Sequence, residues 1–230
     1  MASLDVVRVF CAPDGSEGNA LGVFFEGAEV AEQHRQAVAQ DLGFAETVFV
    51  DDRENAELRI FTPEVELPFA GHPLVGTAWL LRERGYEPEA LHPPAGRVEV
   101  RVEGELTGVS GDPDWGPPFE FVQVDTPAEV DALTGPPDGY DLVAVWAWLD
   151  EERGLVRERV FYPEAGIDED EATGSAALRL CALLGRAIEI RQGRGSVLHA
   201  RPLGESRAEV SGRVVHDETR DYEVAAADSA

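Results

Sequence analysis

Short apolar runs separated by turn-forming residues dominate the chain, and they predict more strands than helices. Strands are expected at residues 6–10, 20–25, 47–50, 57–63, 98–109, 119–124, 142–149 and 157–162, with a hairpin at Gly104 and three further short strands near the end. Apolar residues at helical spacing predict helices at 30–40, 73–84 and 175–184, and a weaker one at 127–133. This pattern predicts an α+β fold.

One unit of this pattern occurs twice. Residues 59–64 read RIFTPE and residues 159–164 read RVFYPE, which match at four of six positions. With a three-residue offset, Gly71 then stands opposite Gly174, and His72 opposite Ser175. We therefore expect two pseudo-symmetric halves, each a β-sheet or barrel wrapped about a central helix. The turn-rich segment GDPDWGPP suggests halves at 1–116 and 117–230, with a frayed tail at about 224–230.

Each copy of the unit has a glycine at the start of its helix. Glycine lets the backbone approach a ligand closely, and the first N–H groups of a helix have no partner within it. Pro73 suits the first helical position, and Thr173 or Ser175 suits a cap. Two such helix starts facing each other across an interface between the halves would make a pocket for a small carboxylate-bearing molecule. The alternative is a pair of ordinary strand-to-helix turns, which the duplication makes less favoured.

Three further polar residues are candidates for chemistry. Glu46 follows Phe44 and Ala45 at the mouth of a strand, so it is expected to be partly removed from water, which suits a proton-transferring group. His72 lies in the first helical turn, where it could share a proton or serve as a capping residue. Asn19 could bind a ligand, although stabilising a turn is the commoner role of asparagine. Glu46 could equally face water.

The composition excludes several classes of function. The formal net charge is −26, and all 19 basic residues are arginine, which argues against nucleic acid as a partner. The five histidines show no metal-ligand spacing, and Cys11 and Cys181 are expected to be buried free thiols. No apolar run reaches the length of about 18 residues that a membrane span requires, and the N-terminus lacks a signal-peptide pattern. We expect a cytoplasmic protein with no membrane contact and no metal.

Five segments together resemble the PhzF-like (phenazine biosynthesis-like) family within the diaminopimelate-epimerase fold. They are VRVFCAPDGSEGNALGVFF, DLGFAETVFV, RIFTPEVELPFAGHPLVGTAWLL, RVFYPEAGIDEDEATGSAALRLCALL and QGRGSVLHARP, and they follow the order found in the family. The elements FAGHP and EDEATGSA together carry the most specific part of this resemblance. The resemblance implies two pseudo-symmetric halves, a site in the cleft between them, and a homodimer.

The resemblance also implies an activity. It places the family's catalytic glutamate, histidine and aspartate at Glu46, His72 and Asp170, and its carboxylate-binding backbone at Gly71, Gly174 and Ser175. Characterised isomerases of the family move a proton on a cyclic dihydro-hydroxyanthranilate without a cofactor, with the glutamate as acid and base. We therefore expect a cofactor-independent isomerase acting on a small carboxylate-bearing metabolite. The alternative is a non-catalytic protein that binds a small carboxylate on the same scaffold; an acidic interaction module would leave these residues unexplained.

The sequence departs from related patterns at three places. Epimerases of this fold use two cysteines, where this chain has Ala70 and Thr173, which excludes two-thiol racemisation. The region between Trp115 and Leu142 is shorter than usual in the family. Glu171 stands where the family commonly has proline, and its charge is expected to raise the pKa of Asp170 and to oppose anionic substrates.

Overall fold

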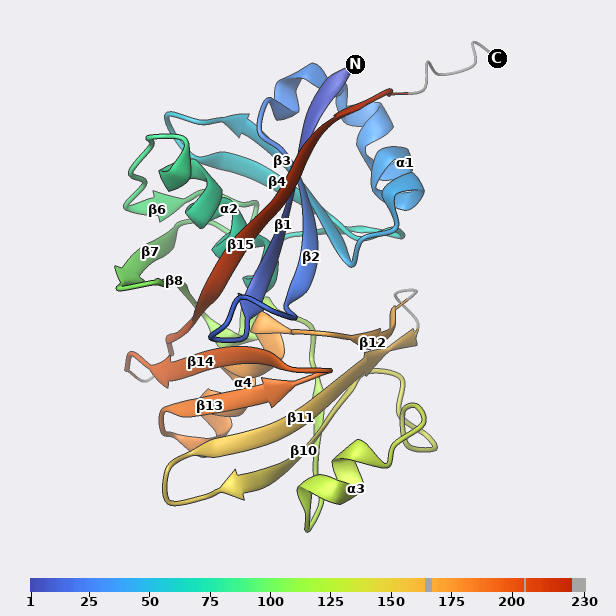
Figure 1. The fold of residues 1–230 in the computed structure, drawn as a ribbon, viewed down its shortest axis with the longest axis vertical. Helices are drawn as coiled ribbons and strands as arrows, with labels where there is room; N and C mark the ends of the chain where they lie inside the picture. Colours follow the sequence, from blue (N-terminus) through green and yellow to red (C-terminus); the bar gives the residue numbers. More distant parts are fainter. Residues whose placement is uncertain (164–166, 205, 225–230) are drawn as a thin grey trace.

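A computed structural model describes residues 1–163, 167–204 and 206–224 of the chain. In the described residues, all strands join one continuous 15-stranded sheet that bends through two stacked halves, as Figure 1 shows. This arrangement confirms the predicted α+β fold. The expected frayed tail falls mostly on residues 225–230, which lie outside the described residues. Glu164, the last residue of the matched segment 159–164, also lies outside them.

The first half contains eight strands. They are β1 Ala2–Cys11, β2 Asn19–Phe24, β3 Glu46–Asp52, β4 Glu57–Phe61, β5 Glu66–Leu67, β6 Ala90–Leu91, β7 Val98–Glu103 and β8 Leu106–Gly111. The second part contributes β9 Glu120–Gln123, β10 Val143–Asp150, β11 Leu155–Tyr162, β12 Ile167–Asp170, β13 Ile188–Gln192, β14 Ser196–Pro202 and β15 Ala208–Tyr222. The helices are α1 Glu32–Leu42, α2 Gly71–Glu83, α3 Pro127–Asp131 and α4 Gly174–Leu184.

The two halves repeat the same succession of elements. The order β2, α1, β3, β4, β5, α2 recurs as β9, α3, β10, β11, β12, α4. The pairings recur as well: the first strand of each set is parallel to the second, and the second, third and fourth are antiparallel neighbours. The duplicated sequence therefore encodes a duplicated supersecondary unit.

The matched arginines of the two copies make equivalent contacts. Arg59 on β4 forms an ion pair with Glu66 on β5, and its guanidinium group lies 5.8 Å from the ring centroid of Phe61. Arg159 on β11 forms an ion pair with Glu169 on β12, and its guanidinium group lies 5.2 Å from the ring of Phe161. Each arginine therefore ties the long strand to the short strand that leads into the central helix.

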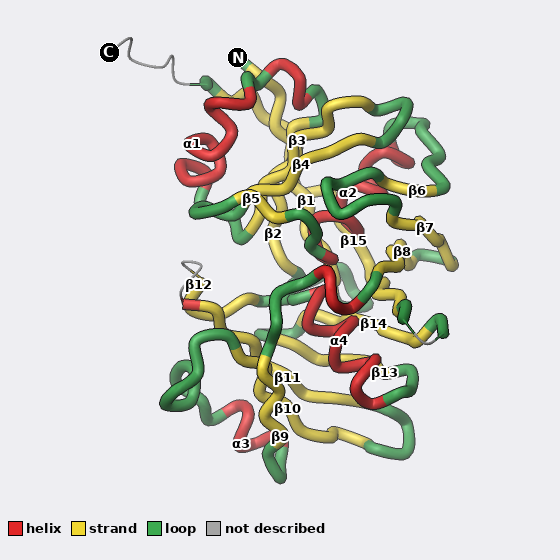
Figure 2. Tube along the Cα trace, turned by 180° about the vertical axis from the view of Figure 1, so that it is seen from behind, coloured by secondary structure: helices red, strands yellow, loops and turns green. Residues whose placement is uncertain are grey.

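The central helices α2 and α4 carry apolar or small residues on nearly all of their sides, and a helix of this composition is buried. Ten of the thirteen residues of α2 are buried, and this helix contacts β1, β2, β3, β8 and β15. In the second half α4 contacts β14 and β15 in the same way. The outer helices α1 and α3 cover the opposite faces, where α1 packs near β3 and β4 and α3 packs on β10 and β11. Figure 2 shows these helices from behind.

The last strand connects the halves. β15 pairs with β14 and β8 through its first part and with β1 through the rest, and the pairing extends from Cys11 with Arg213 to Ala2 with Tyr222. The sequence predicts only a short strand here, because the segment DETRDY is charged; pairing with β1 extends it to fifteen residues. The boundary near residue 116 stays a prediction.

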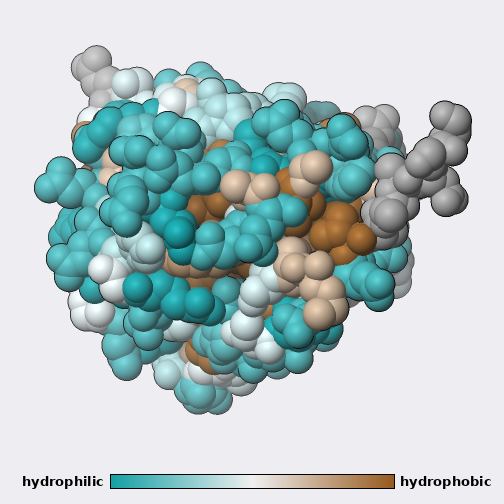
Figure 3. Space-filling view, turned by 90° about the horizontal axis from the view of Figure 1, so that it is seen from above, coloured by the Kyte–Doolittle hydropathy of each residue, from teal (hydrophilic) through white to brown (hydrophobic). Residues whose placement is uncertain are grey.

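The surface agrees with the acidic composition. Seen from above, hydrophilic residues cover most of the molecule, and hydrophobic side chains gather near the middle of that face (Figure 3). Among the described residues, no helix has the length and apolar character needed to cross a bilayer.

Candidate functional site

The first turns of α2 and α4 touch each other where the two halves meet. A Cβ atom added to Gly71 would lie 2.9 Å from the Cα atom of Gly174, and one added to Gly174 would lie 2.8 Å from the Cα atom of Gly71. Any larger residue at either position would therefore force the two backbones apart. The two helix starts expected from the sequence do face each other.

A pocket of about 520 Å³, which includes space open to solvent, lies beside this contact. Its wall is mainly apolar, and both halves contribute to it. The lining residues are Glu46, Thr62, Val65, Leu67, Phe69, Ala70, Pro117, Phe119, Val160, Tyr162, Ile167, Asp170, Thr173 and Ser175. The described lining contains two charged side chains, and both are carboxylates: Glu46 from the first half and Asp170 from the second.

Glu46 begins β3 and is held by His72 from α2. Its Oε2 atom lies 2.8 Å from Nδ1 of His72, and both side chains are buried, with 11% and 2% of their surface exposed. The other ring nitrogen of His72 lies 3.2 Å from the backbone oxygen of Asn19. Because a carbonyl oxygen only accepts, Nε2 carries a hydrogen and donates it. Nδ1 is therefore the ring nitrogen that is left to hydrogen-bond with Glu46.

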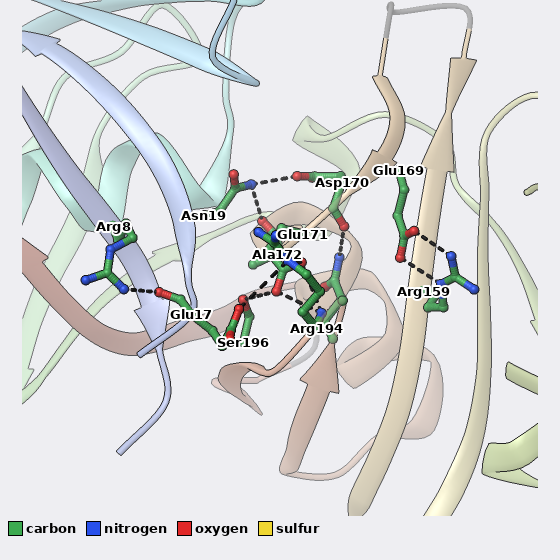
Figure 4. Close-up of polar contacts among 12 residues, drawn as sticks. Arg8, Glu17, Asn19, Arg159, Glu169, Asp170, Glu171, Ala172, Arg194 and Ser196 are labelled. Atoms are coloured by element: carbon green, nitrogen blue, oxygen red, sulfur yellow. Dashed lines mark hydrogen bonds and ion pairs between the residues drawn. The ribbon is translucent and has the colours of Figure 1, made fainter. Parts of the chain in front are cut away.

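Asp170, at the end of β12, is held by three polar side chains. Asn19 donates from Nδ2 to one carboxylate oxygen over 2.6 Å, and the Thr173 hydroxyl donates to the other over 2.6 Å. Gln192 donates to the Asp170 backbone oxygen over 2.9 Å and to the Thr173 oxygen over 2.8 Å. Figure 4 shows Asn19 reaching Asp170 from the other half.

Burial raises the pKa of Asp170 to about 7, and the nearby Glu46 carboxylate raises it as well. The hydrogen bonds from Thr173 and Asn19, together with the charge of His72, act in the opposite direction. Glu46, His72 and Asp170 therefore form one electrostatic group, assembled from residues far apart in the chain. Asn19 connects them, because its backbone carbonyl oxygen faces His72 and its side-chain amide faces Asp170.

Glu171 does not act on Asp170 as the sequence suggests. Its carboxylate accepts hydrogen bonds from the backbone N–H of Arg194, over 2.9 and 3.0 Å, and from the Ser196 hydroxyl over 2.9 Å. The raised pKa of Asp170 comes from burial and Glu46, so the expected cause was wrong. Figure 4 shows Glu171 directed toward Arg194 and Ser196. In this chain, Glu171 ties the segment after Asp170 to the turn between β13 and β14.

The expected helix caps are also corrected. Pro73 is the third residue of α2 rather than the first, because the helix begins at Gly71. Thr173 stands at the cap position of α4, but its hydroxyl is engaged by Asp170, and neither Thr173 nor Ser175 caps the helix. Among the described residues no side chain caps α2 or α4, so the first N–H groups of both helices have no side-chain partner there.

The two copies of the duplicated unit carry different residues at the acidic positions of the site. The pairing of Thr47 with Phe61 and of Val143 with Phe161 places Leu142 at the position equivalent to Glu46. Ile60 pairs with Leu67, and the equivalent Val160 pairs with Asp170. Leu67 therefore occupies the position in the first half that Asp170 occupies in the second. Each half thus has one acid where the other has leucine, and a bound molecule would meet a different acid on each side.

The structure separates the candidate residues into three groups. Glu46, Asp170 and Ser175 line the pocket, whereas His72 and Asn19 support the two acids from behind. Gly71 and Gly174 lie at the contact between helices and are absent from the described lining. Whether these residues act in catalysis and substrate binding stays a prediction.

Sequence reasoning missed much of the pocket wall. Thr62 and Tyr162 occupy matching positions of the repeat and both line the pocket, so their exchange within an otherwise matched segment was a usable signal. The boundary segment also contributes Pro117, and Phe119 follows it. Gln192 gave no signal, because its role depends on contacts that the chain forms only when folded.

Neither thiol is among the described residues that line the pocket. Cys11 and Cys181 are buried and free, as expected, and burial raises the pKa of Cys181 to about 12. Positions 70 and 173 carry alanine and threonine. Within the described residues, no group of three or more His, Cys, Asp or Glu side chains could hold a metal ion.

Comparisons with known proteins agree with this architecture. A family model described as phenazine biosynthesis-like protein matches residues 7–113. A trans-2,3-dihydro-3-hydroxyanthranilate isomerase from Pseudomonas chlororaphis is 33% identical, and the match covers 86% of this chain and 91% of that protein. A PhzF family protein from Enterococcus faecalis superposes with a TM-score of 0.79 at 22% identity, covering 95% of this chain and 97% of its own. A probable proline racemase from Agrobacterium radiobacter superposes with a TM-score of 0.64 at 14% identity, covering 100% and 95%.

Proposed function

The chain belongs to the phenazine biosynthesis-like (PhzF-like) family and is an isomerase, and we propose that it moves a proton on a small carboxylate-bearing molecule with Glu46 as acid and base. The substrate is a cyclic carboxylate of the kind named for the Pseudomonas relative. Glu46 removes a proton from one carbon, the electron pair of that C–H bond shifts into the ring as the double bond moves, and the proton returns to another carbon. No co-reactant is consumed.

The observation that carries this proposal is the position of Glu46. Its side chain lies in an apolar pocket wall and forms a hydrogen bond with His72 behind it. A general base needs access to the substrate and a partner that stabilises it in both charge states. His72 meets the second need, because its Nε2–H is fixed by Asn19 and only its Nδ1 side is left to exchange with Glu46.

The helix starts support the carboxylate part of the proposal. The described lining contains no arginine or lysine, so a substrate carboxylate would need other donors. The uncapped N–H groups at the first turns of α2 and α4 are suited to this, since helix N-termini attract anions. Ser175 lies in the first turn of α4 and lines the pocket. Asp170, which lies in the same half as Ser175 and in the other half from Glu46, then suits a hydroxyl or amino group of the substrate.

The proposal is tested with trans-2,3-dihydro-3-hydroxyanthranilate in heavy water. We expect conversion by the wild-type protein with deuterium incorporated at one carbon. Glu46→Gln should lower the rate by about 10²- to 10⁴-fold, the usual contribution of a general acid–base group. Glu57→Gln removes an exposed carboxylate on the neighbouring strand and serves as the matched control.

The possible outcomes separate the parts of the proposal. Equal rates for wild type and Glu46→Gln would exclude Glu46 as the base. If this compound is not converted, the same exchange measurement on other cyclic carboxylates tests the substrate separately from the catalyst. Binding without exchange by the wild type would favour the non-catalytic alternative. Assembly as a homodimer also stays a prediction, which light scattering of the purified protein checks.

A further inference from the structure

Glu158 is a buried carboxyl group for which the proposed reaction has no use. It lies in the middle of β11 with 0% of its surface exposed, and neither side-chain oxygen has a hydrogen-bond partner among the described residues. Burying a carboxylate without a partner is unfavourable, so such groups are rare in folded proteins. This one lies close to the pocket.

The strand geometry places Glu158 beside the residues that hold Asp170. Side chains alternate along a strand, so Glu158 shares its face of β11 with Val160, which lines the pocket. On the next strand, Glu158 is paired with Gln192. Gln192 is the residue whose amide donates to Asp170 and Thr173. Glu158 is therefore one residue along its strand face from the pocket wall, next to the network around Asp170.

Few charges balance Glu158. Arg157 precedes it on β11, but the Arg157 guanidinium group is committed to Asp131 and to the backbone oxygens of Arg191 and Gly193. The remaining neighbours on its face are Asp170 from β12 and two uncharged partners, Trp146 from β10 and Gln192 from β13.

The one charged residue of the central helix α4 is Arg179, whose guanidinium group is committed to Asp114 and to the backbone oxygen of Pro117. The titratable group among the buried residues of α4 is Cys181, whose pKa is raised to about 12. Burial raises the pKa of Glu158 to about 8, Arg157 lowers it, and the charge of Asp170 raises it further. Glu158 is accordingly protonated at neutral pH, while Asp170 is the carboxyl that titrates there.

We propose that Glu158 is a positioning residue of the active site. Because its carboxyl group is uncharged, the buried negative charge of this half resides on Asp170, which accepts hydrogen bonds from Asn19 and Thr173. This inference rests on the role given to Asp170 in the proposed function. When Glu158 loses its proton, a second negative charge forms behind Asp170. Repulsion between the two carboxylates then loosens the packing of β11 beneath the pocket, and the site loses its geometry at alkaline pH.

The first test measures thermal unfolding against pH for wild type, Glu158→Gln and the control Glu120→Gln, which removes an exposed carboxylate from β9. Because the folded-state pKa of Glu158 is raised, its contribution to stability is full below the unfolded value of 4.5 and is lost as pH rises through about 8. We expect the wild type and Glu120→Gln to lose stability over this window, and Glu158→Gln to lose less. Parallel curves for all three proteins would overturn the proposal.

The second test addresses the coupling and needs no variant at position 158. In Asp170→Asn, the charge that opposes ionisation of Glu158 is gone, so its alkaline transition should move to lower pH by about one unit. An unmoved transition would show that the two carboxyl groups do not interact. Both measurements are free of substrate, so their outcome is independent of whether the proposed reaction is right.

The third readout is catalytic. For a converted substrate, the wild-type rate should fall about tenfold per pH unit above the ionisation of Glu158, whereas Glu158→Gln should lack this alkaline fall. The acid side of the profile, which reports Asp170, should be present in both. A shared alkaline fall would contradict the positioning role even if Glu158 ionises as expected.

Discussion

Gly71 and Gly174 stand in backbone contact at the first residues of α2 and α4, and neither position has room for a Cβ atom. The contact holds the positive ends of two helix dipoles within one short stretch of surface. Such an arrangement is unfavourable unless an anion or solvent compensates it. The glycines therefore serve the site by allowing this approach.

Substituting Gly174 by alanine should separate the two helix starts. The added methyl group would lie 2.8 to 2.9 Å from the backbone of Gly71 and His72, and neither backbone can yield easily. We expect a loss of about 1–3 kcal/mol in the free energy of unfolding, measured with urea. Gly135→Ala, where no atom lies within 4 Å, should leave stability nearly unchanged. Equal effects of the two substitutions would contradict the close contact.

Substituting Thr173 by valine should shift the titration of Asp170. Burial and the Glu46 charge raise the pKa of Asp170, and the Thr173 hydroxyl lowers it, so its removal should raise that pKa above about 7. The stability linked to protonated Asp170 is lost as pH rises through the folded-state value, so this loss should occur at higher pH in the variant. Thermal unfolding against pH measures the shift. Thr77→Val, which removes a buried hydroxyl without a partner, is the control and should leave the transition in place.

Replacing His72 with glutamine should reduce turnover more than stability. Glutamine can bind Glu46, but it cannot share a proton with it, so kcat should fall by about 10²-fold or more. The deuterium exchange assay measures this effect. His34→Gln, a half-buried position on α1, provides the same exchange away from the site. An unchanged rate in His72→Gln would assign the histidine a purely structural role.

Replacing Glu171 with alanine should weaken the segment that carries Asp170. The side chain would no longer accept hydrogen bonds from Arg194 and Ser196, and we expect a loss of about 1.5–3 kcal/mol in unfolding free energy. Urea unfolding measures it, with the exposed Glu152→Ala as the comparison. If the pKa of Asp170 fell in the Glu171 variant, the charge effect first expected from the sequence would have to be reinstated.

The sequence predicted the elements whose signals are local. The matched segments around Arg59 and Arg159 indicated the duplication, and the structure repeats even their ion pairs. The hairpin at Gly104 and the helices near Leu74 and Leu178 followed from turn chemistry and periodicity, and all of them form.

The contacts that define the site depended on tertiary structure. No local pattern relates Asn19 to Asp170, which are 151 residues apart in the chain, or indicates that Thr173 would bind an aspartate instead of capping α4. Glu171 was misjudged because charge alone does not tell which way a side chain points. The sequence did not indicate Glu158, because an acidic residue in a strand of alternating polar and apolar positions normally faces water.

The pairing of β15 with β1 has a consequence for how the protein is made. β1 is synthesised well before its partner strand β15, because nearly the whole described chain lies between them. Until then one edge of β1 lacks its neighbour, and an open edge can pair with other chains. Contacts between distant parts of a chain also form slowly. The edge of β1 is therefore closed only after β15 has been synthesised.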